Sequence, residues 1–277
     1  MNSIDPARIA ALEAHARHMR ATMLRMANRS GVSAHLGGSL SVAEALAVLY
    51  GAVMNDRALP DDARDKFVLS KGHAALALYA ALAEFGVIPE ALLDTYMQDG
   101  SDLSAHPVMK PELGLESSSG SLGQGISLAV GLALAAKRRG YTYNTYVLCG
   151  NGEANEGSVW EACMAAVSFR LDNFTLFLDQ NRMQSDGPSE SVLNVSDRYA
   201  DMLAALGFQV ATVDGHAVDQ LCAAFLAPRA PGRPLAVVGH TVKGKGISFM
   251  ENNNDWHHAR LTDALLSSAL AELGVDP

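Results

Sequence analysis

Two apolar segments, each followed by a turn of small and polar residues, constrain the fold of this chain most strongly. Residues 145–149 lead into the turn Gly150-Asn151-Gly152, and residues 174–178 lead into a turn that contains Asn181. The helix-like segment between them completes a strand–turn–helix–strand unit, which places both turns at the carboxyl edge of a parallel sheet. Two amide oxygens beside glycines at such an edge suit a hard cation that bridges a diphosphate.

The rest of the chain continues the alternation of strands and helices. We therefore expect an α/β fold, a doubly wound and mainly parallel sheet with helices on both faces, in one domain over residues 1–277. Ser41 and Glu44 form a capping-box pattern at the start of one of the helices. Further strands are expected at 66–69, 209–213 and 235–239, and helices at 5–28, 41–54, 126–139, 262–273 and directly after His73.

Composition excludes several classes of function. The net charge of −9 argues against a nucleic-acid partner, because such proteins present a basic face. No segment has the roughly 20 apolar residues that a membrane span requires, and the N-terminus lacks the pattern of a signal peptide. Cys149, Cys163 and Cys222 lie in apolar segments without metal-ligand spacing, so we expect reduced, buried thiols in a cytoplasmic protein.

The two turns resemble the metal–diphosphate motif of thiamine-diphosphate enzymes, and the surrounding sequence, from about residue 29 to about residue 273, resembles transketolase. In that family Gly-Asp-Gly is followed about thirty residues later by Asn. The Asp, the Asn and a backbone carbonyl hold Mg²⁺ or another divalent cation such as Ca²⁺ or Mn²⁺. The resemblance therefore implies Asn151, Asn181 and Met183 as metal ligands, with thiamine diphosphate as cofactor.

Asn151 departs from the family pattern, which has Asp at this position. An amide still offers a neutral oxygen, but the site has one negative charge fewer, and metal affinity falls with ligand charge. Glu153 and Glu156 are near in sequence and offer compensating charge. A weakened site, a substrate-tuned site and an inactive site are all consistent with this substitution.

Four loop histidines add to the resemblance. A single histidine in a loop is more commonly structural than catalytic, but His35, His73, His106 and His257 each lie in a segment similar to a transketolase motif. The segments are His35-Leu36-Gly37-Gly38-Ser39, Ser70-Lys71-Gly72-His73, Ser104-Ala105-His106-Pro107 and Trp256-His257-His258. By this resemblance His73 and His257 donate to the diphosphate, and His35, His106 and His257 bond the substrate sugar; which of His257 and His258 faces the site stays open.

The segment Gly120-Ser121-Leu122-Gly123-Gln124-Gly125 is similar to another transketolase motif. The resemblance implies that Gly120, Leu122, Gly152, Glu153 and Asn181 contact the cofactor. It also implies that residues 241–246 form an active-site flap, whereas we interpret Asp214-Gly215-His216 as a structural turn.

Transketolases use further domains for the pyrimidine end of the cofactor and for substrate phosphate, and the resemblance does not include them. The chain therefore resembles the N-terminal subunit of a split transketolase, active only with a separately encoded pyrimidine-binding subunit in a heterotetramer, with Glu156 at the interface. Its expected activity is transfer of a two-carbon ketol unit between sugars or sugar phosphates. The alternatives are a decarboxylating synthase resembling deoxyxylulose-phosphate synthase and a non-catalytic homologue.

Overall fold

A parallel sheet forms the centre of the protein, for which a computed structural model describes residues 5–55 and 58–276. The strand order is β1-β2-β3-β7-β6, and every neighbouring pair is parallel. The strands are β1 (Lys66–Leu69), β2 (Thr145–Gly150), β3 (Phe174–Gln180), β6 (Gln209–Asp214) and β7 (Leu235–His240). The predicted strands and the parallel sheet are confirmed, with differences of one or two residues at the carboxyl ends.

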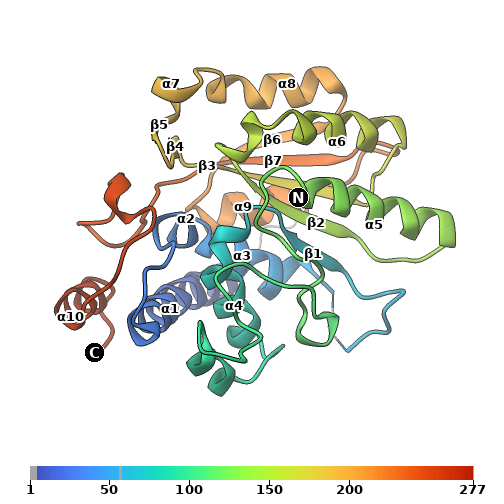
Figure 1. Ribbon diagram of the computed structural model, residues 1–277. Coiled ribbons are helices and arrows are strands. Elements are labelled where there is room, and N and C mark those ends of the chain that lie inside the picture. The colour runs from blue at the N-terminus through green and yellow to red at the C-terminus, as the bar shows by residue number, and fades with distance from the viewer. Residues whose placement is uncertain (1–4, 56–57, 277) are drawn as a thin grey trace.

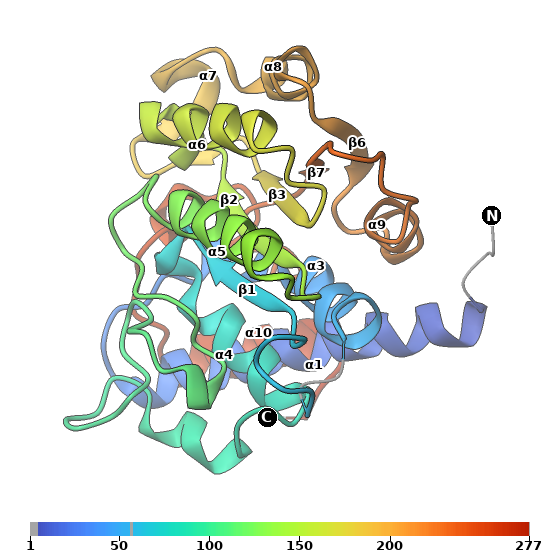
Figure 2. The ribbon, with the colours of Figure 1, turned by 90° about the vertical axis from the view of Figure 1, so that its right-hand side faces the viewer.

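Helices cover both faces of this sheet, as predicted (Figures 1 and 2). On one face lie α5 (Gly125–Arg139), α6 (Gly157–Ser168) and α8 (Tyr199–Leu206). On the other lie α1 (Pro6–Ser30), α3 (Ala43–Val48), α4 (Ala75–Glu84) and α9 (Val218–Phe225), with α10 (Asp263–Glu272) against α1. The short elements are α2 (Gly37–Leu40), α7 (Ser189–Val192), β4 (Met183–Gln184) and β5 (Gly187–Pro188).

Alternation of side chains along each strand divides the interior into two apolar cores. In β2, Tyr146 and Leu148 belong to the core under α1, α3 and α4, whereas Val147 and Cys149 belong to the core under α5 and α6. Because successive residues of a strand point to opposite faces, a continuous apolar run is buried on both sides. The three cysteines are free and buried, as expected.

The capping-box prediction at Ser41 is wrong. Helix α3 begins at Ala43 after Val42, which provides no side-chain cap, and the chain continues after Val48 as a π-helical turn, Leu49–Val53. The Ser41 hydroxyl instead contacts the Gly38 carbonyl at 3.1 Å and donates to the Asp179 carboxylate at 2.9 Å. A buried carboxylate needs donors, and this need outweighs a helix cap.

None of the helices within the described residues combines the length and the apolar character needed to cross a membrane.

Candidate active site

A cavity of about 230 Å³ lies beyond the carboxyl ends of β1, β2 and β3. Loops that follow these strands supply part of its lining, and the remainder comes from loops around His35, His106, Gly120, Lys243 and His257. It brings together every predicted site residue except Glu156: His35, His73, His106, Gly120, Leu122, Asn151, Gly152, Glu153, Asn181, Met183 and His257. The roles of these residues stay predictions, but their convergence at one sheet edge is the arrangement expected for a ligand site of an α/β protein.

The four loop histidines form a cluster around His35. The His35 ring lies 5.5 Å from His73, 5.7 Å from His106 and 5.3 Å from His257, measured between ring centroids. His257 lines the cavity, whereas His258 is exposed with its ring 4.4 Å from that of His35. His257 is therefore the member of the adjacent pair that faces the site.

Burial keeps these imidazoles neutral near pH 7. Burial and then the neighbouring histidines lower the pKa of His35 to about 4, and burial and then Lys243 lower the pKa of His257 to about 4. The pKa values of His73 and His106 are also lowered, again chiefly by burial. A neutral imidazole has one donor and one acceptor nitrogen, so each ring is able to give or accept a hydrogen bond.

The three predicted metal ligands are adjacent and offer only neutral oxygens. Asn181 Oδ1 accepts from the Met183 amide at 3.0 Å, and Asn151 Nδ2 lies 3.5 Å from the Met183 carbonyl. The buried Asn151 Oδ1 has no hydrogen-bond partner. Arg182, between Asn181 and Met183, takes the left-handed conformation with φ 60°, which forms this tight turn. A buried oxygen without a hydrogen-bond partner fits the ligand preference of a hard divalent cation.

Glu153 connects three loops at the cavity through hydrogen bonds. Its buried carboxylate accepts from the Ser70 hydroxyl at 2.5 Å, from the Gly123 amide at 2.9 Å and from the Gly150 amide at 3.1 Å. It thereby ties the ends of β1 and β2 to the loop that carries Gly120 and Leu122. With these bonds in place, Glu153 fixes the shape of the cavity, and its predicted contact with the cofactor remains a prediction.

Close packing of two loops depends on Gly72. A Cβ atom at this position would lie 2.7 Å from the Gly120 amide nitrogen, a separation that backbone atoms do not tolerate. Glycine therefore allows the loop after β1 to touch the Gly120 loop, and this contact places His73 and Gly120 on the same cavity.

A buried ion pair at the cavity was not predicted from the sequence. Lys71 Nζ lies 2.6 Å from Asp179 Oδ2, and both side chains are at most 1% exposed. Asp179 also accepts from Asn181 at 2.7 Å and from Thr241. Burial alone would raise the pKa of Asp179, but Lys71 and these donors lower it. The only signal in the sequence was a charged residue at the end of each of two apolar strands.

The flap predicted at residues 241–246 contributes Lys243 to the cavity. Lys243 Nζ donates to Asn254 Oδ1 at 2.8 Å, and burial and then the charge of Lys71 lower its pKa to about 8. His216, expected to be structural, accepts from the Val242 amide at 2.8 Å and lies outside the cavity. Lys243 thus places a second amino group, besides Lys71, at the proposed diphosphate site.

Glu156 is the predicted site residue that does not reach the cavity. It is exposed and directly precedes α6. A Cβ atom on Gly123 would lie 2.9 Å from Glu156 Cβ, so the side chain starts beside the Gly123 loop, on the surface of the chain. This exposure leaves Glu156 available to another protein chain.

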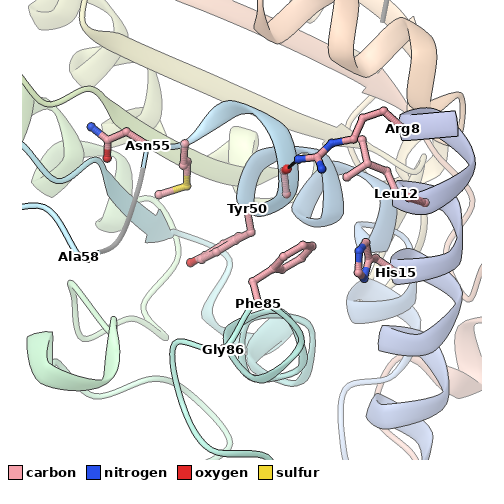
Figure 3. Close-up of a pocket in the computed structure, with 11 residues that line it drawn as sticks. Arg8, Leu12, His15, Tyr50, Asn55, Ala58, Phe85 and Gly86 are labelled. Atoms are coloured by element: carbon pink, nitrogen blue, oxygen red, sulfur yellow. Dashed lines mark hydrogen bonds between the residues drawn. The ribbon is translucent and has the colours of Figure 1, made fainter. Parts of the chain in front are cut away.

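A larger cavity, of about 540 Å³, lies elsewhere, between α1 and the end of α4 (Figure 3). Two basic side chains at this cavity already have partners within the chain: Arg8 donates to the Gly51 carbonyl, and His15 lies 2.6 Å from Glu84. None of the predicted site residues lines it. We therefore assign the chemistry to the smaller cavity.

Comparison with known proteins identifies the family of this chain. Residues 13–277 match the family model "Transketolase, thiamine diphosphate binding domain". The chain is 41% identical to the 6-deoxy-6-sulfo-D-fructose transketolase subunit SqwG of Clostridium sp. (strain MSTE9), covering 95% of this chain and 96% of that protein. It is 37% identical to one subunit of the apulose-4-phosphate transketolase of Actinobacillus succinogenes, covering 95% of each.

Among solved structures, transketolase from Campylobacter jejuni superposes with a TM-score of 0.85 at 29% identity. The match covers 99% of this chain and 44% of that one, so the chain spans less than half of the solved enzyme. The parallel sheet with a cavity at its carboxyl edge defines an α/β cofactor-binding protein. The chain belongs to the transketolase family and contains its thiamine diphosphate-binding domain, which confirms the predicted family and fold. The predicted resemblance to a separate N-terminal transketolase subunit is also confirmed.

Proposed function

We propose that this chain is the diphosphate-binding subunit of a two-chain transketolase that transfers a two-carbon ketol unit from a ketose to an aldose. The observation that carries this proposal is the convergence of four neutral histidines with Asn151, Asn181 and Met183 on one cavity. Family membership and the subunit-type relatives support the reaction class.

Thiamine diphosphate and a divalent cation, Mg²⁺ or another such as Ca²⁺ or Mn²⁺, are the proposed cofactors. The metal would be held by Asn151, Asn181 and the Met183 carbonyl, and the unpartnered Asn151 oxygen supports this assignment. The diphosphate would be held by His73 and His257. The remaining cofactor contacts would come from Gly120, Leu122, Gly152, Glu153 and Asn181.

His35, His106 and His257 would contact the substrate. When bound, thiamine diphosphate supplies a carbon nucleophile and an electron sink for cleavage beside a carbonyl. The chain's part is to donate to the sugar oxygens where negative charge develops and to hold or move their protons. Neutral imidazoles suit this role because each offers both a donor and an acceptor.

A second, separately encoded subunit would complete the site. The subunit names of the relatives support a partner, and the exposure of Glu156 at the start of α6 supports this surface as its binding face. The proposed assembly is a symmetric heterotetramer with two copies of each chain. We propose sugars or sugar phosphates as substrates and the cytoplasm as location.

Product analysis with the assembled complex tests this function. The complex is incubated with a panel of ketoses and aldoses, free and phosphorylated. It should form new ketoses that are two carbons longer than the aldose acceptor, and their formation should require thiamine diphosphate and Mg²⁺. Release of carbon dioxide from an α-keto acid would instead identify a decarboxylating synthase. Failure of the complex to bind thiamine diphosphate would identify a non-catalytic homologue.

The substitution Asn151→Asp should lower the dissociation constants of Mg²⁺ and thiamine diphosphate in the complex on the order of tenfold. The reason is that a carboxylate attracts the cation electrostatically more strongly than an amide does. Turnover need not rise, since tighter ground-state binding does not lower the chemical barrier. Isothermal titration with and without Mg²⁺ measures the change.

The matched control is Asn155→Asp, which adds the same charge four positions away at a residue outside the cavity. We expect a much smaller effect there. Equal tightening by both substitutions would show that charge near the site, rather than ligation by residue 151, controls the affinity. Absence of metal-dependent binding to the unaltered complex would show that the site has lost its cofactor.

A further inference from the structure

The turn Asp214-Gly215-His216, which follows β6, packs against the first residues after β7. The Gly215 amide donates to the His240 carbonyl at 2.7 Å, and a Cβ atom on Gly215 would lie 2.4 Å from Thr241 Cγ2. A larger residue at position 215 would therefore disturb this contact. Because β6 and β7 pair in parallel, their carboxyl ends meet at one edge of the sheet. The turn thus lies directly beside the predicted flap, residues 241–246.

The hydrogen bonds of His216 determine which of its ring nitrogens carries the proton. Nε2 lies 2.8 Å from the Val242 amide nitrogen, and a backbone amide only donates, so Nε2 must be the unprotonated acceptor. Nδ1 lies 3.0 Å from Glu44 Oε2. In a neutral ring with Nε2 unprotonated, Nδ1 carries the proton and donates to this carboxylate. His216 therefore connects Glu44 to the backbone of the flap.

Glu44 is itself fixed in the interior. Arg20 Nη2 donates to Glu44 Oε2 at 2.6 Å, and both side chains are at most 10% exposed. Burial alone would raise the pKa of Glu44, but the hydrogen bond from His216 and the charge of Arg20 lower it to about 2. The carboxylate is therefore ionised and able to accept from both residues. Since Arg20 belongs to α1 and Glu44 to α3, His216 is attached to the helical layer of the protein.

Lys243 is the flap residue that lines the cavity. Its side chain is buried, and Nζ donates to Asn254 Oδ1 at 2.8 Å and to the Gln184 carbonyl at 3.2 Å. Both acceptors are uncharged, whereas the other lysine at the cavity, Lys71, is paired with the carboxylate of Asp179. A buried ammonium group bonded to uncharged acceptors favours an anionic ligand. The position of the flap therefore affects how strongly the cavity attracts a diphosphate.

We propose that His216 is a positioning residue, which holds the flap where Lys243 reaches the cavity. The proposal rests on the proposed function, because it takes this cavity as the diphosphate site. Loss of the bond from the Val242 amide should have two effects. Amide hydrogen exchange in the flap should become faster, and the dissociation constant of thiamine diphosphate should rise about fivefold, the usual contribution of one hydrogen bond.

Two substitutions separate the two hydrogen bonds of His216. In His216→Gln the amide oxygen is able to replace Nε2 as the acceptor for Val242. In His216→Asn the shorter side chain is able to replace only Nδ1, as the donor to Glu44. We therefore expect His216→Asn to raise the dissociation constant about fivefold and His216→Gln to change it less than about twofold.

Two measurements on the complex of this chain with its partner test these expectations. Isothermal titration with thiamine diphosphate in the presence of Mg²⁺ gives the dissociation constants. Hydrogen exchange followed by mass spectrometry, without thiamine diphosphate, reports the order of residues 241–246. His216→Asn should exchange faster in this segment than the natural chain, and His216→Gln should exchange at the natural rate.

The Lys243→Met background tests whether His216 acts through Lys243. There His216→Asn should change the dissociation constant less than about twofold, because the flap no longer brings an ammonium group to the cavity. The matched control is His240→Asn, the same substitution at an exposed histidine outside the cavity, at the end of β7. It should leave both cofactor binding and hydrogen exchange of the flap unchanged.

The outcomes separate this proposal from the proposed function. Natural exchange of the flap in His216→Asn would show that other contacts hold it, such as the bond from the Gly244 amide to the Gly37 carbonyl at 2.9 Å. Equal weakening of binding in both Lys243 backgrounds, or by both His216 substitutions, would show a general structural role. Each of these results overturns the proposal and leaves the transketolase function standing. If the unaltered complex does not bind thiamine diphosphate, the proposed function fails, and hydrogen exchange still decides whether His216 holds the flap.

Discussion

Purified without a partner subunit, this chain is expected to show negligible ketol transfer, and addition of the partner should restore it. The physical reason is that the chain provides the diphosphate-binding half of the site, whereas the resemblance to transketolase assigns the pyrimidine-binding half to another chain. The relatives named as subunits match this chain over nearly their whole length. Coupled assays of the separate and mixed subunits measure the restoration.

A substitution at Glu156, on the proposed partner-binding surface, tests whether this surface binds the partner. Glu156→Ala should weaken assembly or activity of the complex while leaving the fold of the isolated chain intact, because the residue is exposed and outside the cavity. Sedimentation velocity of the mixed subunits reports the assembly. Full activity from rigorously partner-free protein would contradict the two-chain proposal.

The second large effect is expected at the histidines. His106→Ala should lower turnover on the order of 10²-fold, the usual effect of losing one donor to a developing negative charge. Its effect on cofactor binding should be small, because its proposed role is to contact the sugar. His73→Ala should mainly raise the dissociation constant of thiamine diphosphate. Turnover numbers and cofactor titrations of the assembled complexes separate the two effects.

His18→Ala is a suitable control for these substitutions. His18 contacts Glu84 through its ring nitrogen and has a side chain that is 52% exposed. It does not line the proposed active site, so turnover and cofactor affinity should stay unchanged. Exchanged phenotypes, with His73→Ala affecting turnover and His106→Ala affecting cofactor affinity, would show that the two roles are misassigned.

The sequence predicted the sheet well because its strands are apolar on both faces. Segments such as 145–149 and 174–178 have no polar alternation, which indicates strands buried between two helical layers. The same pattern predicted that Asn151 and Asn181 lie close together, because the ends of parallel strands meet at one edge. The other residues of the cavity were predicted from the resemblance of their loops to transketolase motifs.

Polar contacts between distant segments were not predictable in this way. Ser41 has the spacing of a helix cap, yet its hydroxyl contacts Asp179, 138 positions away. The pair of Lys71 and Asp179 joins two strands, and its partners are brought together only by the sheet. The contact between Ser189 and Asn151 depends on the hairpin of β4 and β5, which is too short to leave a periodic pattern.

The neutral ligands of the proposed metal site would determine how the enzyme takes up its cofactor. Asn151, Asn181 and Met183 contribute uncharged oxygens, and the carboxylate bonded to Asn181, that of Asp179, is already neutralised by Lys71. These neutral ligands alone should bind a hydrated divalent cation only weakly. The negative charge that holds the cation would then come from the diphosphate of the cofactor. We expect metal and cofactor to enter as one unit, each raising the apparent affinity for the other by the same factor. Occupancy of the enzyme would then follow the concentration of the metal–cofactor complex, and scarcity of either component would empty both positions together.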